Sequence, residues 1–135
     1  MTSTLPLPLP VTLITACIMT WFYLVLSARV SRGRMRYRVS LGDGGNQDLL
    51  ARMRAHANFI EYVPLLLILI GVLEISSADP VALAAGGGLL VVFRLMHVIG
   101  IPRPAPNIFR FVGASGTYLL LLAASIWGLA LVFVE

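Results

Sequence analysis

Four stretches, each long and apolar enough to cross a membrane, constrain the fold of this chain more than any other feature. They cover residues 7–28, 59–75, 81–101 and 111–134, and a spanning helix needs roughly 17 to 25 mostly apolar residues. Of the 135 residues, 59% are hydrophobic and 12% are charged, a balance that is rare in soluble domains. The short connections "SSADP" and "GIPRPAPN" make successive helices antiparallel. We therefore predict an all-α integral membrane protein, a four-helix up-down bundle forming one domain over residues 1–135.

The positions of the arginines predict how the chain is oriented. All ten basic residues are arginine; five of them lie at 29–38, after the first stretch, and Arg103 and Arg110 follow the third. The positive-inside rule then places the first and third connections in the cytoplasm and both termini on the other side. No basic residue precedes the first stretch, which favours a retained helix over a signal peptide. Because these arginines flank membrane spans, the net charge of +4 does not indicate nucleic-acid binding.

A stripe of polar residues leads into the second apolar stretch. Arg54, Asn58 and Glu61 are spaced i, i+4 and i+7, so on a helix they share one face, whereas His56 points nearly the other way. Glu61 lies about 10 Å below Arg54 at 1.5 Å per residue. This depth places Glu61 at or inside the hydrocarbon boundary.

Arg94 lies inside the third stretch and needs a partner there. A lone arginine in the hydrocarbon costs at least about 2.5 kcal/mol, and Glu61 is the carboxylate predicted at a similar depth. One interpretation is therefore a structural Glu61–Arg94 ion pair that fixes the helix register. That pair leaves Arg29, Arg54 and Arg110 without carboxylates in the same leaflet. An excess of guanidinium groups with one glutamate also suits a small ligand that carries carboxylates and an amine.

Other kinds of chemistry find little support in the sequence. His97 follows Arg94 by one turn, and neither it nor His56 has further His, Cys or carboxylate neighbours at metal-ligand spacing, so we predict no metal site. Serine, histidine and aspartate form no recognisable nucleophilic triad. Cys17 is the only cysteine, which excludes an intrachain disulfide.

The segment "RMRAHANFIEYVPLLL" resembles the second-helix signature of the MAPEG superfamily, the membrane-associated proteins in eicosanoid and glutathione metabolism. The order of the other segments is similar as well: "LSAR" closes the first helix, "SLGDGGN" precedes the second, "FRLMHVIG" lies on the third and Arg110 opens the fourth. The resemblance covers nearly the whole chain and is strongest to bacterial members.

This resemblance implies a protomer of a homotrimer in the bacterial inner membrane, with glutathione bound as a co-substrate between protomers at the cytoplasmic side. Arg110 matches the position of the group that activates the thiol. The positions that match glutathione contacts are Arg29, Arg54, Asn58, Glu61, Tyr62 and Arg94. Glutathione offers carboxylates to arginine and an ammonium group to Glu61, and a guanidinium beside its sulfur favours the thiolate.

Some catalytic positions of the family differ here. Eicosanoid-type enzymes carry a tyrosine one turn after the fourth-helix arginine or at the end of the third helix, where this chain has Ala114 and Ile101. Phe111 replaces a serine beside the arginine. Three functions therefore stay open: a glutathione S-transferase or peroxidase acting on lipophilic electrophiles, a non-catalytic protein that binds a thiol or a lipid headgroup, and a membrane protein whose polar cluster is purely structural.

Overall fold

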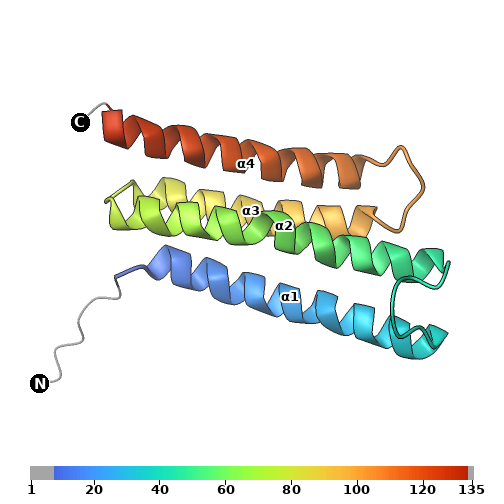
Figure 1. Ribbon diagram of the computed structural model, residues 1–135. Coiled ribbons are helices and arrows are strands. Elements are labelled where there is room, and N and C mark those ends of the chain that lie inside the picture. The colour runs from blue at the N-terminus through green and yellow to red at the C-terminus, as the bar shows by residue number, and fades with distance from the viewer. Residues whose placement is uncertain (1–7, 134–135) are drawn as a thin grey trace, which may run out of the picture.

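The computed structural model describes residues 8–133, which form four helices and no strand (Figure 1). The helices are α1 (Pro10–Tyr37), α2 (Gln47–Ile75), α3 (Pro80–Gly100) and α4 (Ile108–Phe133). All four are long and apolar enough to cross a membrane. The predicted all-α, four-helix architecture is confirmed.

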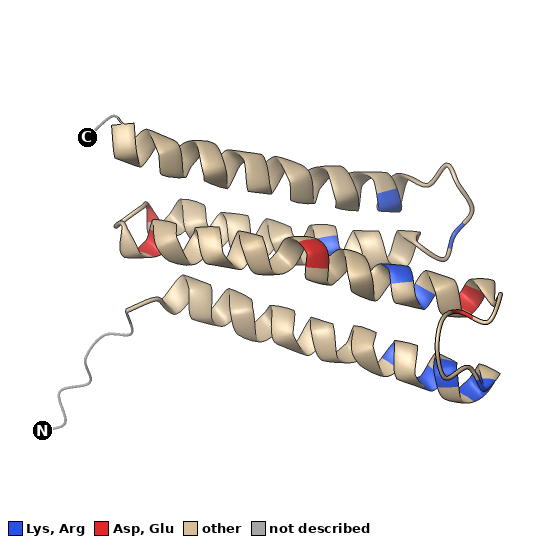
Figure 2. Cartoon of the chain, viewed as in Figure 1, with Lys and Arg blue, Asp and Glu red and all other residues tan. Residues whose placement is uncertain are grey.

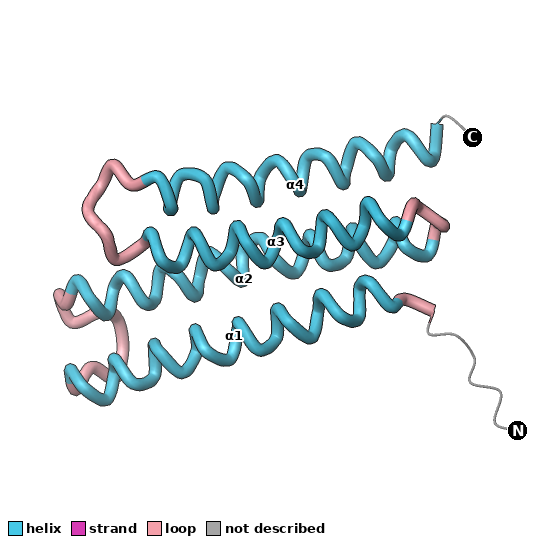
Figure 3. Tube along the Cα trace, turned by 180° about the vertical axis from the view of Figure 1, so that it is seen from behind, coloured by secondary structure: helices cyan, strands magenta, loops and turns pink. Residues whose placement is uncertain are grey.

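The helices run up and down, and α1 and α4 lie on opposite sides of α2 and α3 in the views from both sides (Figures 1 and 3). α1 packs on α2 and α3, and α4 packs on the same two helices, while α1 and α4 share no contact within the described residues. Neighbouring helices therefore form four sides, and the sides made by α1 with α3 and by α2 with α4 lie opposite each other. We refer to them as the α1–α3 flank and the α2–α4 flank.

The helices extend beyond the apolar stretches at the end of the bundle where the arginines gather (Figure 2). α1 continues to Tyr37 and α2 already begins at Gln47, because arginine is a good helix former and a helix need not stop where the hydrocarbon does. The Asn46 side chain accepts a hydrogen bond from the Leu49 N–H (2.9 Å), so it caps α2. The glycines of the connection, Gly42, Gly44 and Gly45, adopt positive φ angles, which glycine tolerates at low cost.

A compact apolar core holds the four helices together. Phe59 of α2 stacks on Phe22 of α1, with ring centroids 5.6 Å apart. α3 and α4 approach most closely near the arginine-rich end, where a Cβ at Gly113 would lie 2.6 Å from the Phe93 carbonyl oxygen. This close approach fixes the start of α4, and with it Arg110, against the end of α3. The fully buried apolar side chains include Met19, Leu49, Val63, Leu66 and Leu90.

At the opposite end, a single carboxylate joins two helices. Glu74, in the last turn of α2, accepts hydrogen bonds from the backbone N–H groups of Val11 and Thr12 (2.8 Å each) and from the Thr12 hydroxyl (2.6 Å). The first N–H groups of a helix have no partner within it and carry the positive end of its dipole. Glu74 therefore caps α1 from a neighbouring helix.

Candidate functional site

The predicted polar stripe of α2 lies on the α2–α4 flank. Arg54 and Glu61 are exposed and Asn58 is half-buried. His56 lies on the other side of the helix, where its Nε2 is 2.9 Å from the Ser27 hydroxyl of α1, in agreement with the helical periodicity. Arg54 and Glu61 have no hydrogen bond or ion pair with any residue among those described (8–133).

The prediction of a Glu61–Arg94 ion pair is wrong. Within residues 8–133 the only carboxylate–arginine pair joins Asp48 to Arg52, and the Arg94 guanidinium instead donates to Asn58 Oδ1 at 2.7 Å. At 100° per residue, Glu61 points about 60° farther from the buried side of α2 than Asn58 does. Equal depth was therefore not enough to bring Glu61 to Arg94.

Arg94 is completely buried at 0% exposure. Its other neighbours are the Thr117 hydroxyl and His97 Nδ1, both 3.5 Å away, and the Phe59 ring, whose centroid is 5.7 Å from the guanidinium carbon. Its Nε–H is a buried donor without a partner in the structure. Arg94 thus lies behind Asn58, as seen from the flank, and no carboxylate of the described chain neutralises it.

Two tyrosines connect α2 and α4 on the same flank. The Tyr118 hydroxyl donates to the Tyr62 hydroxyl at 3.2 Å, and the two rings meet edge to face with centroids 5.1 Å apart. Tyr62 is half-buried, whereas Tyr118 is 48% exposed. Tyr62 directly follows Glu61 in the sequence, so this pair marks the apolar end of the polar stripe.

Arg110 occupies the first turn of α4, at the arginine-rich end. Asn107 accepts a hydrogen bond from its backbone N–H (3.1 Å), and a Cβ at Gly100 would clash with its backbone, so the start of α4 is tightly held. The side chain itself is exposed and has no hydrogen bond or ion pair within the described part of the chain. His97 of α3 is buried beside this part of α4, where a Cβ at Gly113 would lie 2.5 Å from its backbone nitrogen.

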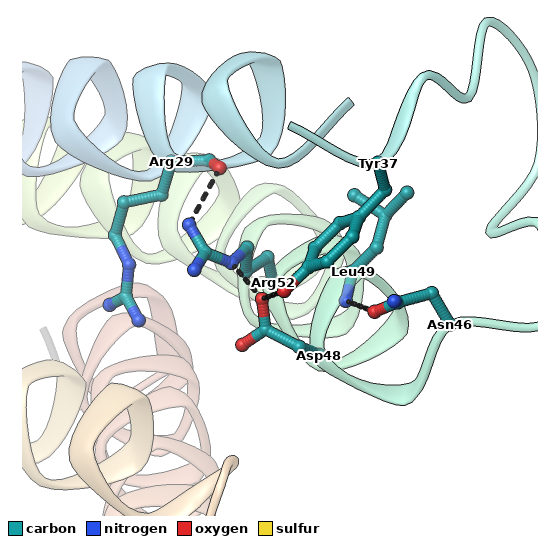
Figure 4. Close-up of polar contacts among 6 residues, drawn as sticks. All are labelled: Arg29, Tyr37, Asn46, Asp48, Leu49 and Arg52. Carbon is teal, nitrogen blue, oxygen red and sulfur yellow. Dashed lines mark hydrogen bonds and ion pairs between the residues drawn. The ribbon is translucent and has the colours of Figure 1, made fainter. Parts of the chain in front are cut away.

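Arg29 lies on the opposite side of the molecule. It lines a cavity of about 410 Å³ on the α1–α3 flank, together with Trp21, Val25, Leu95 and Val98. Figure 4 shows the nearby contact between α1 and α2, in which Arg52 bonds to Asp48 (2.8 Å) and to the Arg29 carbonyl oxygen (3.2 Å). A single copy of the chain therefore does not bring Arg29 together with the other predicted site residues.

The comparisons with known proteins agree with this architecture. The sequence pattern of the MAPEG family matches residues 11–130. The chain belongs to the MAPEG family. The inner membrane protein YecN of Escherichia coli K12 is 36% identical over 103 residues, which cover 73% of this chain and 76% of YecN, and YecN of the O6:H1 strain CFT073 gives the same values. No solved structure matches significantly.

This MAPEG-family chain has functional candidates that the sequence did not single out. Thr117 and Tyr118 lie in an otherwise apolar part of α4, and the structure brings them to Arg94 and Tyr62. Tyr118 follows Ala114 by one helical turn, so a tyrosine of α4 still reaches the flank from a deeper position. The signal that could have found them is the adjacent polar pair Thr117 and Tyr118 in "GASGTYLLL". Among residues 8–133, no three His, Cys, Asp or Glu side chains are grouped as a metal ion would need.

Proposed function

We propose that this membrane protein binds glutathione on the α2–α4 flank and acts as a glutathione S-transferase or peroxidase on lipophilic electrophiles. One observation carries the proposal: Arg54 and Glu61 on this flank, and Arg110 in the first turn of α4, have no partner among the described residues, although unpaired charges beside hydrocarbon are costly. The arginines suit the carboxylates of glutathione and Glu61 suits its ammonium group. Membership of the MAPEG family is consistent with this ligand.

The proposed chemistry assigns different tasks to the side chains of α2 and to Arg110 of α4. Arg54, Asn58, Glu61 and Tyr62 hold the ligand, and Arg110 stabilises the thiolate of glutathione by its positive charge. The thiolate then forms a sulfur–carbon bond with the electrophilic carbon of a substrate that arrives through the bilayer, and the leaving group departs with the electron pair of its bond to that carbon. In the peroxidase reaction it would instead attack a hydroperoxide oxygen, breaking the O–O bond and releasing an alcohol, and a second glutathione would convert the resulting sulfenic acid into a disulfide and water.

The position of Arg29 supports a site shared between copies. Arg29 lies on the α1–α3 flank and Arg54 on the α2–α4 flank, so both can touch one ligand only where unlike flanks of two copies meet. Contacts between unlike surfaces form a ring when the rotation between copies closes, and we propose a closed ring of three, as the family resemblance implies. A monomeric native mass in mild detergent, with glutathione binding intact, would refute this assembly.

A mixing experiment tests the shared site directly. Arg29→Leu and Arg54→Leu should each abolish binding when expressed alone. When the two variants are co-expressed, some interfaces combine an intact Arg29 flank with an intact Arg54 flank, and these should bind glutathione again. The absence of any recovery in verified mixed assemblies would place both arginines outside a shared site.

A non-catalytic function is the second candidate, favoured by Ala114, Ile101 and Phe111 at positions where the family's eicosanoid enzymes carry reactive side chains. Such a protein would bind a thiol or a lipid headgroup without turnover. Titration of the detergent-solubilised protein with glutathione, followed by an assay with a generic aromatic electrophile, separates the candidates. Binding with turnover supports the enzyme, binding alone supports the second candidate, and no binding refutes both glutathione functions.

We also propose that the protein is located in the inner membrane, as the similarity to YecN suggests, with both termini outside the cytoplasm. The arginines gather at the end that carries the α1–α2 and α3–α4 connections (Figure 2), which the positive-inside rule assigns to the cytoplasm. A reporter fused after Glu135 should therefore be active only in its extracytoplasmic form. Cytoplasmic activity at this position would reverse the orientation.

A further inference from the structure

Arg94 matches a glutathione-contacting position of the family, yet its surroundings assign it another role. The side chain is 0% exposed, and the half-buried Asn58, a member of the polar stripe on the α2–α4 flank, accepts its hydrogen bond at 2.7 Å. A ligand on the flank would meet Asn58 before it could meet Arg94. What Arg94 does for such a ligand must therefore act through Asn58.

The contact between these two side chains fixes which way the Asn58 amide faces. A guanidinium group has five donors and no acceptor, so the atom of Asn58 that lies 2.7 Å from it must be the carbonyl oxygen. The amide nitrogen then points away from Arg94. Since Asn58 is half-buried on the stripe between Arg54 and Glu61, the direction away from Arg94 is the direction of the flank.

We propose that Arg94 is a positioning residue, which holds the Asn58 carboxamide so that its two N–H donors face an anionic group of the ligand. This inference rests on the proposed glutathione function and deepens it. In this orientation Asn58 and Arg54 form a purely donating surface for a carboxylate. An amide that Arg94 did not hold could flip and present its oxygen to the carboxylate, and the two oxygens would repel each other.

The other contacts of Arg94 explain why Asn58 is held firmly. The Thr117 hydroxyl donates its hydrogen to the Gly113 carbonyl oxygen (2.8 Å), so it can only accept from Arg94, and at 3.5 Å it does so weakly. No described carboxylate neutralises the guanidinium. The Asn58 oxygen is therefore the strongest acceptor that this buried charge has, and hydrogen bonds to a charged donor are the strong ones.

The substitution Asn58→Asp separates orientation from folding. A carboxylate has nearly the same shape as the amide and gives Arg94 a counter-charge, so the melting temperature should be equal to or higher than that of the wild type. The same change removes both donors and places a negative charge at the site. Glutathione affinity should fall by about tenfold or more, the effect of losing a hydrogen bond to a charged group.

Two further variants serve as controls. Asn46→Asp makes the same chemical change at the cap of α2, where aspartate caps as well as asparagine, so it should leave melting temperature and affinity unchanged. Asn58→Leu removes both the acceptor of Arg94 and the donors for the ligand. It should lower the melting temperature and the affinity together, because a buried charged donor is left unpaired.

Arg94 itself provides the second arm of the test. Arg94→Leu releases the amide and should weaken glutathione binding, and Arg94→Lys, which can still donate to Asn58, should restore part of the affinity. Wild-type affinity in Arg94→Leu would overturn the proposal. A lower melting temperature of Asn58→Asp, or its undiminished affinity, would also overturn it.

Failure of the proposed function can be told apart from failure of this inference. If the wild type does not bind glutathione, the proposed function and the ligand-facing role of the amide are both refuted. The melting temperatures of Asn58→Asp and Asn58→Leu would still decide whether Arg94 holds the Asn58 oxygen, because they do not depend on any ligand.

Discussion

Glu61 and Glu74 are two glutamates of the same helix in opposite circumstances. Glu74 accepts three hydrogen bonds of 2.6 to 2.8 Å from the first turn of α1. Glu61 is exposed and has no partner among the described residues. Both carboxylates lie next to hydrocarbon, where a charge without a partner costs free energy. Within residues 8–133, the fold therefore compensates the charge of Glu74 but not that of Glu61.

The same contrast separates two larger regions. Polar groups between α1 and α2 are paired within the chain: Asp48 binds Arg52 and the Tyr37 hydroxyl (2.8 and 2.9 Å). The charged side chains Arg54 and Glu61 of the α2–α4 flank, and Arg110 at the start of α4, are unpaired in the part of the chain that the structure describes. We infer that the first region maintains the bundle and that the second is available to a ligand. The predictions below test this division.

The largest effect is expected for Arg110→Leu. If Arg110 stabilises the thiolate, its loss should lower turnover by about a hundredfold or more, while most of the glutathione affinity remains, because the interaction is strongest in the activated state. Steady-state kinetics and titration measure the two quantities separately. Arg103→Leu, at an exposed arginine that stacks on Phe109, is the control and should behave like the wild type. Unchanged turnover of Arg110→Leu would remove Arg110 from the chemistry.

Glu74→Gln should destabilise the bundle without affecting the ligand. The neutral amide weakens three hydrogen bonds and the interaction with the positive end of α1, a loss of about 2 kcal/mol. Thermal unfolding in detergent should therefore begin at a lower temperature, whereas glutathione affinity should be unchanged. If Glu74→Gln unfolded like the wild type, the inference that paired polar groups maintain the bundle would be wrong.

Glu61→Gln should have the opposite profile. With no partner in the protomer, Glu61 contributes little to folding, so the unfolding temperature should stay near that of the wild type. Binding should weaken by about tenfold, since the ammonium group of glutathione loses its counter-charge. The Glu61–Arg94 pair expected from the sequence predicted a loss of stability as well. Such a loss would show that Glu61 has a partner in the assembled protein.

The sequence was sufficient for the helices and for the face on which the stripe lies. Apolar length predicts the four spans, although α1 ends and α2 begins well outside the predicted stretches, and periodicity separates His56 from Asn58. These features depend on local geometry along one helix. The contact between Arg94 and Asn58 depends instead on how α2 and α3 are rotated against each other, which depth in the membrane does not determine.

Other contacts were missed for a similar reason. Thr12 and Glu74 are far apart in the sequence, and no local pattern predicts that the end of α2 caps the start of α1. Thr117 and Tyr118 look like ordinary polar residues of an apolar helix until α4 is placed beside α2 and α3. Whether the flank binds glutathione depends on a second molecule, so that assignment remains a proposal.

The smallest effect is expected for Tyr118→Phe, and it probes the apolar border of the flank. The change removes the hydrogen bond from Tyr118 to the Tyr62 hydroxyl (3.2 Å) but keeps the edge-to-face ring contact. Tyr62 can still donate to a ligand, so affinity should fall only about two- to fivefold, equivalent to roughly 0.5 to 1 kcal/mol.

Tyr62→Phe is the matched control for Tyr118→Phe, because it leaves the Tyr118 hydroxyl without its acceptor and the ligand without a donor. It should therefore have the larger effect on affinity. If Tyr118→Phe instead abolished turnover as completely as Arg110→Leu, Tyr118 would take part in the chemistry. Tyr118, one turn deeper than Ala114, would then take the role of the tyrosine that eicosanoid-type enzymes carry at the position of Ala114. The flank would be a catalytic surface along its full depth.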